Sequence, residues 1–176
     1  MRFEPLPLAG AYLIDRQPIR DDRGWFSRAF SGEQFAERGL VTGWAQTQTS
    51  FNPRAGTLRG LHYQVPPAAE AKLLLCLRGA IFDVMVDLRP GSATRGQHYC
   101  TRLRGGDQRM VYIPAGFAHG YQTLEDDTEV FYHSSEPYRP ALARGLAWDD
   151  PTLSIPWPLA PTAMSDRDRT LPRWQP

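Results

Sequence analysis

The chain has 176 residues, of which 41% are hydrophobic and 22% are charged, and its formal net charge at pH 7 is +1. These values are typical of one globular domain, here residues 1–176, that is long enough to bury a substantial core. A nearly neutral chain with no long apolar run and no secretion signal argues against nucleic-acid and membrane partners, so we expect a cytoplasmic protein.

The N-terminal part of the chain is predicted to hold one strand and one short helix. The strand covers residues 11–19. Ser31 is placed to cap the helix, Gln34 stands at the capping-box position, Phe35 is apolar and Gly39 lies near the end. We expect no second helix of comparable strength.

Period-two alternation predicts that most of the remaining chain forms strands. In residues 80–88, Phe82 and Val84 fall on one face, whereas Asp83 and Met85 fall on the other. Turn signals containing glycine or proline separate such runs. The expected strands are residues 57–64, 72–78, 80–88, 97–103, 109–113, 119–124 and 128–134.

Many short strands with little helix predict an all-β sandwich or barrel. Pro114, Gly116 and His119 form a Pro-x-Gly-x-x-His pattern at a strand end. This pattern is typical of cupins, so it favours a jelly-roll barrel with His119 pointing into it. The segment from Trp148 onward is rich in proline and tryptophan, which predicts an irregular C-terminal tail packed over the outside or across an opening.

The candidate metal ligands are too few for a metal-dependent cupin. Such proteins offer two histidines one residue apart, whereas here His62 is followed by Gln64, and Glu70 is further away. His62 and His119 alone would make a poor divalent site. We therefore expect no metal and no other cofactor, and a metal-dependent cupin oxygenase is a disfavoured alternative.

Acid–base chemistry without a metal agrees better with the residues. Lys72 is the only lysine in the chain. If the strands at 57–64 and 72–78 pair, the side chains of His62 and Lys72 both point into the barrel. This pair suits removal of a proton next to a carbonyl, because the ammonium stabilises the enolate oxygen, and the Tyr132 phenol can return a proton from the opposite side. The ordinary alternative is that each residue only packs in the core.

Strand parity raises one difficulty for this site. Arg59 and His62 fall on opposite faces of a regular strand. Both can serve one site only if Gly60 marks a bulge or if a second subunit completes the pocket.

The chain also carries a series of motifs in a fixed order. They are Asp22-Arg23-Gly24-Trp25-Phe26, Gly56-Thr57-Leu58-Arg59-Gly60-Leu61-His62-Tyr63-Gln64, Lys72-Leu73, Asp83-Val84-Met85-Val86-Asp87-Leu88-Arg89, Ile113-Pro114-Ala115-Gly116-Phe117-Ala118-His119-Gly120, Trp148-Asp149-Asp150-Pro151 and Ser165-Asp166-Arg167-Asp168. In these motifs, over nearly its whole length, the chain resembles the dTDP-4-dehydrorhamnose 3,5-epimerase family. The resemblance implies a metal-free cupin jelly roll that works as a homodimer. It also implies inversion of C3 and C5 of a nucleotide-linked 4-keto-6-deoxyhexose through enolates, from dTDP-4-dehydro-6-deoxy-D-glucose to dTDP-4-dehydro-L-rhamnose.

The same resemblance implies roles for individual residues. His62 resembles the general base, and Asp168 the carboxylate that orients it. Tyr132 resembles the general acid on the opposite side of the sugar, and Lys72 the cation near the C4 oxygen. Tyr138 resembles the aromatic residue that stacks on the nucleotide base. The residues that resemble other substrate contacts are Arg23, Gln46, Gln48, Arg59, His119 and Arg167.

The chain departs from the family pattern at four positions, all among the expected nucleotide or sugar contacts. Gln48 stands where the family usually has asparagine, Arg28 and Ala143 stand for glutamates, and Arg167 stands for a lysine. The departures concern the nucleotide and the sugar more than the reaction type. Two alternatives therefore stay open: an epimerase that acts at one carbon only, and a non-catalytic cupin that binds a sugar nucleotide.

Overall fold

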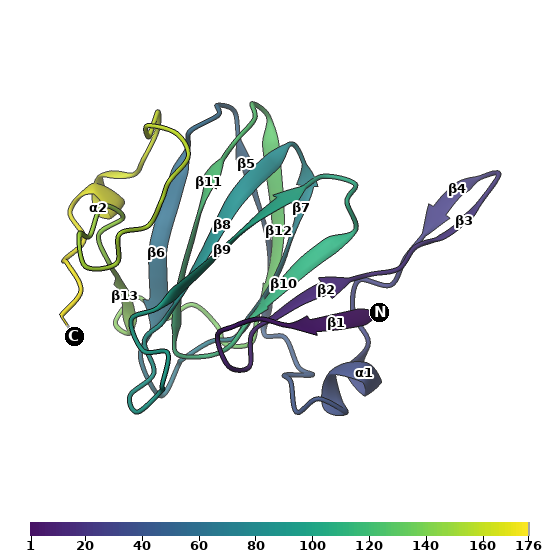
Figure 1. Cartoon of the computed structure of the whole chain (residues 1–176), viewed down its shortest axis with the longest axis horizontal. Helices are drawn as coiled ribbons and strands as arrows, with labels where there is room; N and C mark the ends of the chain where they lie inside the picture. The colour runs from purple at the N-terminus through teal and green to yellow at the C-terminus, as the bar shows by residue number, and fades with distance from the viewer. Residues whose placement is uncertain (176) are drawn as a thin grey trace.

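Two antiparallel β-sheets face each other in the computed structural model, which describes residues 1–175 (Figure 1). The six-stranded sheet contains, in spatial order, β1 (Arg2–Pro5), β2 (Tyr12–Asp15), β10 (Arg109–Ile113), β7 (Lys72–Arg78), β12 (Thr128–Ser134) and β5 (Gln46–Asn52). The five-stranded sheet contains β13 (Ala143–Gly145), β6 (Leu58–Gln64), β11 (Phe117–Thr123), β8 (Ala80–Asp87) and β9 (His98–Arg104). The prediction of an all-β fold is therefore confirmed.

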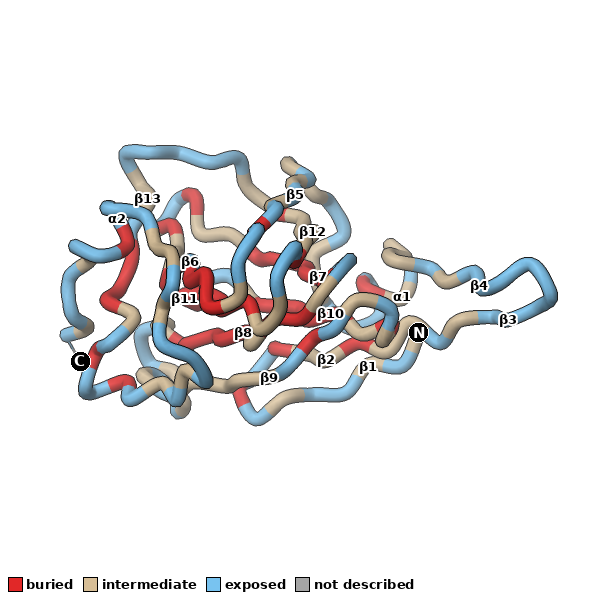
Figure 2. Tube along the Cα trace, turned by 90° about the horizontal axis from the view of Figure 1, so that it is seen from above, coloured by how far each residue is buried: buried red, intermediate tan, exposed pale blue. Residues whose placement is uncertain are grey.

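Two short strands and two short helices complete the fold. The strands β3 (Ile19–Asp21) and β4 (Gly24–Phe26) form a hairpin that projects from the sandwich and is exposed along its length (Figures 1 and 2). The helices are α1 (Gly32–Ala36) and α2 (Asp166–Arg169). Neither helix in residues 1–175 is long and apolar enough to cross a membrane.

The strand between residues 11 and 19 was predicted too long. It ends at Asp15, and Ile19 begins the projecting hairpin instead. Gln17 has a φ of +50°, which no extended strand adopts, and Pro18 has no N–H to donate to a neighbouring strand. The backbone therefore leaves the sheet between these two strands.

The core between the sheets is built by alternate residues of the strands. Met85 of β8, Phe117 of β11, Leu74 of β7 and Val130 of β12 belong to one buried cluster. The opposite face of β8 is buried as well, because Val84 and its neighbours pack against the C-terminal segment. A strand covered on both faces is held firmly and can fix side chains that face the interior.

Helix α1 covers the outer face of the six-stranded sheet through the buried side chain of Phe35. The predicted capping box is wrong. Within the described chain, Ser31 makes no side-chain hydrogen bond to the helix, and Gln34 Oε1 is buried without a partner. Packing of Phe35 against Tyr112 and the sheet therefore holds this short helix, rather than its cap.

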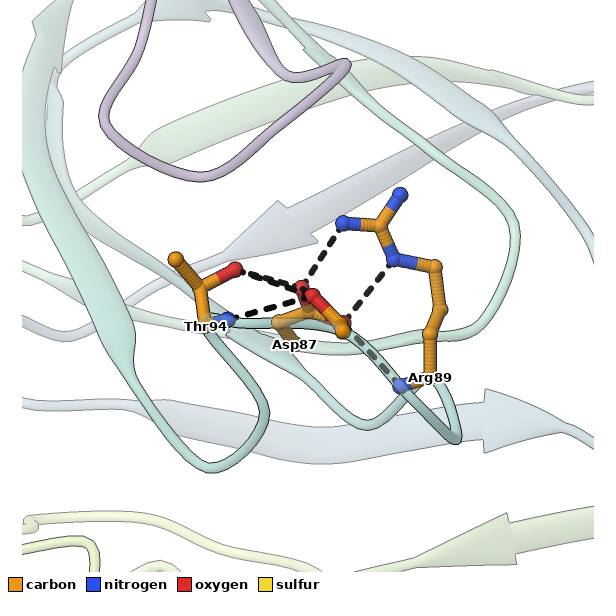
Figure 3. A network of polar contacts seen from close by, with 4 residues as sticks. Asp87, Arg89 and Thr94 are labelled. Carbon is orange, nitrogen blue, oxygen red and sulfur yellow. Dashed lines mark hydrogen bonds and ion pairs between the residues drawn. The ribbon is translucent and has the colours of Figure 1, made fainter.

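Asp87 secures the loop that follows β8 (Figure 3). Its carboxylate accepts hydrogen bonds from Arg89 Nε at 2.9 Å and Nη2 at 2.7 Å, from Ser92 Oγ at 2.6 Å and from Thr94 Oγ1 at 2.7 Å. Burial by itself raises the pKa of Asp87, but these bonds outweigh it and hold the pKa well below its ordinary value. The loop is therefore held by one ionised, fully buried carboxylate.

Strand β6 contains a bulge at Gly60, which is one of the two ways in which Arg59 and His62 could serve one site. His119 of β11 lies opposite His62, whereas Tyr121 lies opposite Arg59, so β6 has one residue more than β11 over this stretch. Gly60 has a φ of +119°, and a Cβ atom there would lie 2.6 Å from Gly120 Cα. Arg59 and His62 thereby face the same side of the sheet.

Replacing Gly60 by alanine should strongly destabilise the fold. The change adds a backbone clash to an unfavourable φ, so we expect the free energy of unfolding to fall by about 3–5 kcal/mol in urea titrations. Gly24→Ala is the matched control, because Gly24 has a φ of +124° but no atom within 4 Å of the added Cβ. The control should cost only about 1–2 kcal/mol. Equal losses for both variants would contradict the close approach to Gly120.

Candidate active site

A cavity of about 560 Å³ lies between the two sheets. His62 and Arg59 reach it from β6, Lys72 from β7, Tyr132 from β12 and Asp168 from α2. An adjoining pocket of about 190 Å³ shares four of the lining residues. All predicted site residues except Arg23 line these two pockets, namely His62, Tyr132, Asp168, Lys72, Gln46, Gln48, Arg59, His119, Tyr138 and Arg167.

His62 and Asp168 form a hydrogen-bonded pair at the wall of the cavity. His62 Nε2 lies 2.6 Å from Asp168 Oδ1, and the Gly60 N–H donates to Asp168 Oδ2 at 3.1 Å. Burial of Asp168 favours its protonated form, but the hydrogen bonds from His62 and Gly60 outweigh burial and lower the pKa of this carboxyl. An ionised carboxylate only accepts, so Nε2 carries the proton and the Nδ1 lone pair of His62 is available to take another.

Lys72 and Tyr132 face this pair from the other sheet. The condition that the strands of His62 and Lys72 pair is not met, because β6 and β7 belong to different sheets. Their side chains meet across the sandwich, where Tyr132 also lines the cavity. Burial raises the pKa of Tyr132, as does the neighbouring Tyr121, so the phenol keeps its proton and can act as an acid.

The ammonium of Lys72 is held by a buried carboxylate. Lys72 Nζ lies 3.0 Å from Glu70 Oε1, and each side chain is only 11% exposed. Gln64 Nε2 donates to the other oxygen of Glu70 at 2.8 Å. Sequence reasoning weighed Glu70 only as a metal ligand and missed this role. In residues 1–175 no group of three or more His, Cys, Asp or Glu side chains is placed to hold a metal ion.

Lys72→Arg should lower kcat although the positive charge is retained. A guanidinium is larger and planar, so it cannot occupy the compact site beside Glu70 without moving away from the cavity. Loss of one positioned charge donor costs about 10²-fold in comparable sites, and steady-state kinetics would measure it. Arg78→Lys, on the exposed end of the same strand, is the control and should change nothing. Full activity of Lys72→Arg would show that any cation suffices.

A second histidine–carboxylate pair adjoins the same cavity, which His119 lines. His119 Nε2 is 2.7 Å from Asp83 Oδ2, and both side chains are buried. Tyr121 lies two residues further along β11, and its hydroxyl is 2.7 Å from Ser50 Oγ. Sequence reasoning missed Tyr121 and Asp83 as site residues. Parity would have found Tyr121, because residues two apart on a strand face the same way.

The adjoining pocket is lined by Gln46 and Gln48 from β5 and by Arg167 from α2. Tyr138 donates its N–H to Gln46 Oε1 at 2.8 Å, and Arg167 Nη1 donates to the Tyr138 hydroxyl at 3.2 Å. Gln48 and Ala143 line the same pocket. An exposed aromatic ring suits stacking against another flat ring, and the guanidinium beside it suits a phosphate or a carboxylate.

Arg23 lies outside both pockets. It stands at the tip of the projecting hairpin, where its side chain is 89% exposed and pairs with Asp21 at 2.6 Å. Within one chain, the structure therefore does not bring Arg23 together with the other predicted site residues.

Comparison with known proteins identifies the family of this chain. A family model described as dTDP-4-dehydrorhamnose 3,5-epimerase matches residues 5–176. The chain belongs to the dTDP-4-dehydrorhamnose 3,5-epimerase family. A family member of that name from Sinorhizobium fredii is 40% identical over 173 residues, which cover 98% of this chain and 89% of the relative.

Two further relatives show the range of the family. A dTDP-4-dehydrorhamnose 3-epimerase from Streptomyces niveus is 39% identical over 170 residues, or 96% of this chain and 82% of the relative. The crystal structure of the epimerase from Legionella pneumophila, in complex with dTDP-4-keto-L-rhamnose, superposes with a TM-score of 0.89 at 32% identity, covering 99% of both chains. The cupin-like jelly roll is thus the fold of the family.

Proposed function

We propose that this chain inverts C3 and C5 of a dTDP-linked 4-keto-6-deoxyhexose, as its relatives' names describe. The observation that carries the proposal is the meeting of His62, Lys72 and Tyr132 around one cavity, with Asp168 behind the histidine. C3 and C5 both neighbour the C4 carbonyl, so one base and one enolate-stabilising cation can serve both carbons in turn.

Each inversion requires one proton to leave and another to return. His62 takes the proton from the carbon beside the carbonyl, and the C–H electron pair becomes an enolate whose oxygen is stabilised by Lys72. Asp168 stabilises the imidazolium that forms. Tyr132 then donates its phenolic proton to the other side of the same carbon, and solvent restores both groups before the next step.

The adjoining pocket supplies the contacts for the nucleotide. Tyr138 offers a ring for the base, and Arg167 offers forked donors for the pyrophosphate, joined by Arg59 from the main cavity. Gln46 and Gln48 add amide groups that can bond the nucleotide. These placements support a nucleotide-linked sugar over a free one.

Deuterium exchange tests the proposal directly. The protein is incubated with dTDP-4-keto-6-deoxy-D-glucose in heavy water, and incorporation at C3 and C5 is followed by NMR. We expect deuterium at both carbons. Exchange at C3 alone would select the single-carbon reaction, which the 39% identical 3-epimerase makes a specific alternative. Binding without exchange, for this and other nucleotide ketosugars, would indicate a non-catalytic binding protein.

We further propose that the chain is a single domain that acts as a homodimer in the cytoplasm. We propose that it needs no metal and no other cofactor. Exposed apolar residues support a partner surface: Trp25 and Phe26 on the hairpin are 50% and 70% exposed, and Phe51 and Leu77 on the six-stranded sheet are 55% and 46% exposed. A hairpin docked on a second copy would also carry Arg23 toward that copy. A monomeric mass in solution would contradict the dimer, and loss of exchange after dialysis against a chelator would contradict metal independence.

A further inference from the structure

Asp168, whose carboxylate contacts His62, lies on helix α2, which is too short to be stable without its flanking segments. Helix α2 has only four residues, and a helix of one turn has no stability of its own. Upstream of α2, Leu58 N–H donates to Ala163 O at 2.9 Å, which fastens the segment to β6. Downstream, Ala147 N–H donates to Pro172 O at 2.8 Å. The position of Asp168 therefore depends on how firmly both flanks are attached.

Asp150 makes the last attachment on the downstream side. Its side chain is buried, with 2% of the residue exposed. Oδ1 accepts from Thr152 N–H at 2.8 Å and Leu153 N–H at 3.1 Å, which closes a turn. Oδ2 accepts from Trp174 N–H at 2.6 Å, across 24 residues of chain. One oxygen thus shapes the local loop, and the other fastens the end of the segment that carries Asp168.

The ring of Trp174 strengthens the same attachment. It lies directly over Gly96, where any Cβ atom would collide with it, and the Arg95 guanidinium lies 6.0 Å from the ring centroid. The ring also joins the apolar cluster beneath the five-stranded sheet. The backbone N–H of Trp174 is therefore held where only Asp150 Oδ2 accepts it within the described chain.

We propose that Asp150 is a positioning residue for the epimerisation: by holding Trp174 it fixes the downstream flank of α2, and thereby the contact of Asp168 with His62. The proposal rests on the proposed function for its catalytic part. Asp150 touches neither pocket that holds the reacting groups. Its expected effect is on the rate of proton transfer and not on substrate binding.

Asp150→Asn removes the hydrogen bond to Trp174 N–H by replacing one carboxylate oxygen with an NH₂ group. Asparagine keeps Oδ1 for the local turn, but its amide NH₂ cannot accept from Trp174 N–H. The direct readout is the Gly60 N–H, which donates to Asp168 Oδ2 and reports the position of that carboxylate without substrate. We expect amide exchange at Gly60 to accelerate relative to the amides of β7, with KM unchanged and kcat lowered by about 10- to 100-fold, as for misplaced catalytic groups.

Asp107→Asn is the matched control, because the Asp107 carboxylate holds the turn between β9 and β10 by accepting from Arg104 N–H at 3.1 Å and Arg109 N–H at 2.9 Å, and it lines neither pocket of the site. This variant should lower the free energy of unfolding. The rate of Gly60 amide exchange relative to the β7 amides, and kcat, should stay as in the unmodified protein. If Asp150→Asn does not fold, a chain ending at Arg173 removes the same N–H and keeps the Asp150 turn. It should show the same fast exchange at Gly60.

Three outcomes would overturn the proposal. They are unchanged Gly60 exchange in both Asp150→Asn and the shortened chain, unchanged kcat in Asp150→Asn, and an equal loss of kcat in Asp107→Asn. If the unmodified protein exchanges no substrate protons at all, the proposed function fails instead. The Gly60 measurement still decides whether Asp150 positions Asp168.

Discussion

His62→Ala should abolish deuterium incorporation at both C3 and C5. His62 is the base of the proposed mechanism, and the contact of 2.6 Å between its Nε2 and Asp168 Oδ1 fixes the imidazole ring at the cavity wall. Removing a positioned general base typically costs about 10²- to 10⁴-fold, so exchange at both carbons should fall to a small fraction of the unmodified rate. NMR of the sugar in heavy water measures both carbons in one experiment.

The control for this variant is His98→Ala. His98 lies on β9, is partly buried and is outside the two pockets, so its loss should leave exchange unchanged. Added imidazole should restore part of the activity of His62→Ala, because the truncated side chain leaves room beside Asp168. If one carbon still exchanged at the full rate, a second base would serve it, and His119 with its partner Asp83 would be the candidate.

Tyr132→Phe should separate proton removal from inversion. The base can still take a proton and return one to the same side, so exchange should continue, but no acid remains on the opposite side. We expect inversion to fall by about 10²-fold or more while exchange changes much less. The measured quantity is the ratio of product epimer formed to deuterium incorporated.

Tyr99→Phe is the matched control, because Tyr99 packs against the same core cluster as Tyr132 and lines neither pocket. In the unmodified enzyme, burial raises the pKa of Tyr132, so the acid stays protonated up to a pH above the ordinary tyrosine value of about 10. Inversion should therefore decline only above that pH. An equal loss of exchange and inversion in Tyr132→Phe would contradict its role as the acid.

Strands with clear alternation were predictable from the sequence, and polar strands were not. Residues 72–78, 109–113 and 128–134 match observed strands at both ends. Strand β5 was missed, because Gln46–Asn52 contains only one apolar residue, Phe51, and lies at the edge of its sheet. Its inward side chains face a polar cavity, so no hydrophobic period marks the strand.

The contacts between distant residues could not be read from periodicity. Alternation along a regular strand placed Arg59 and His62 on opposite faces and pointed to a bulge at Gly60. The structure confirms that bulge. Parity could not show that β6 and β7 lie in different sheets, since strand order depends on the whole fold. Asp168 was found only through the resemblance, because a helix of four residues leaves no repeating pattern in the sequence.

The reacting groups come from both layers of the sandwich, since His62 is on the five-stranded sheet and Lys72 and Tyr132 are on the six-stranded sheet. A sugar that contacts all three residues therefore links the two sheets. A ligand at 100 times its Kd adds about 2.7 kcal/mol to the stability of the folded state. This added stability should slow proteolysis even of strands far from the cavity. The concentration of substrate should therefore also affect the lifetime of the protein in the presence of a protease.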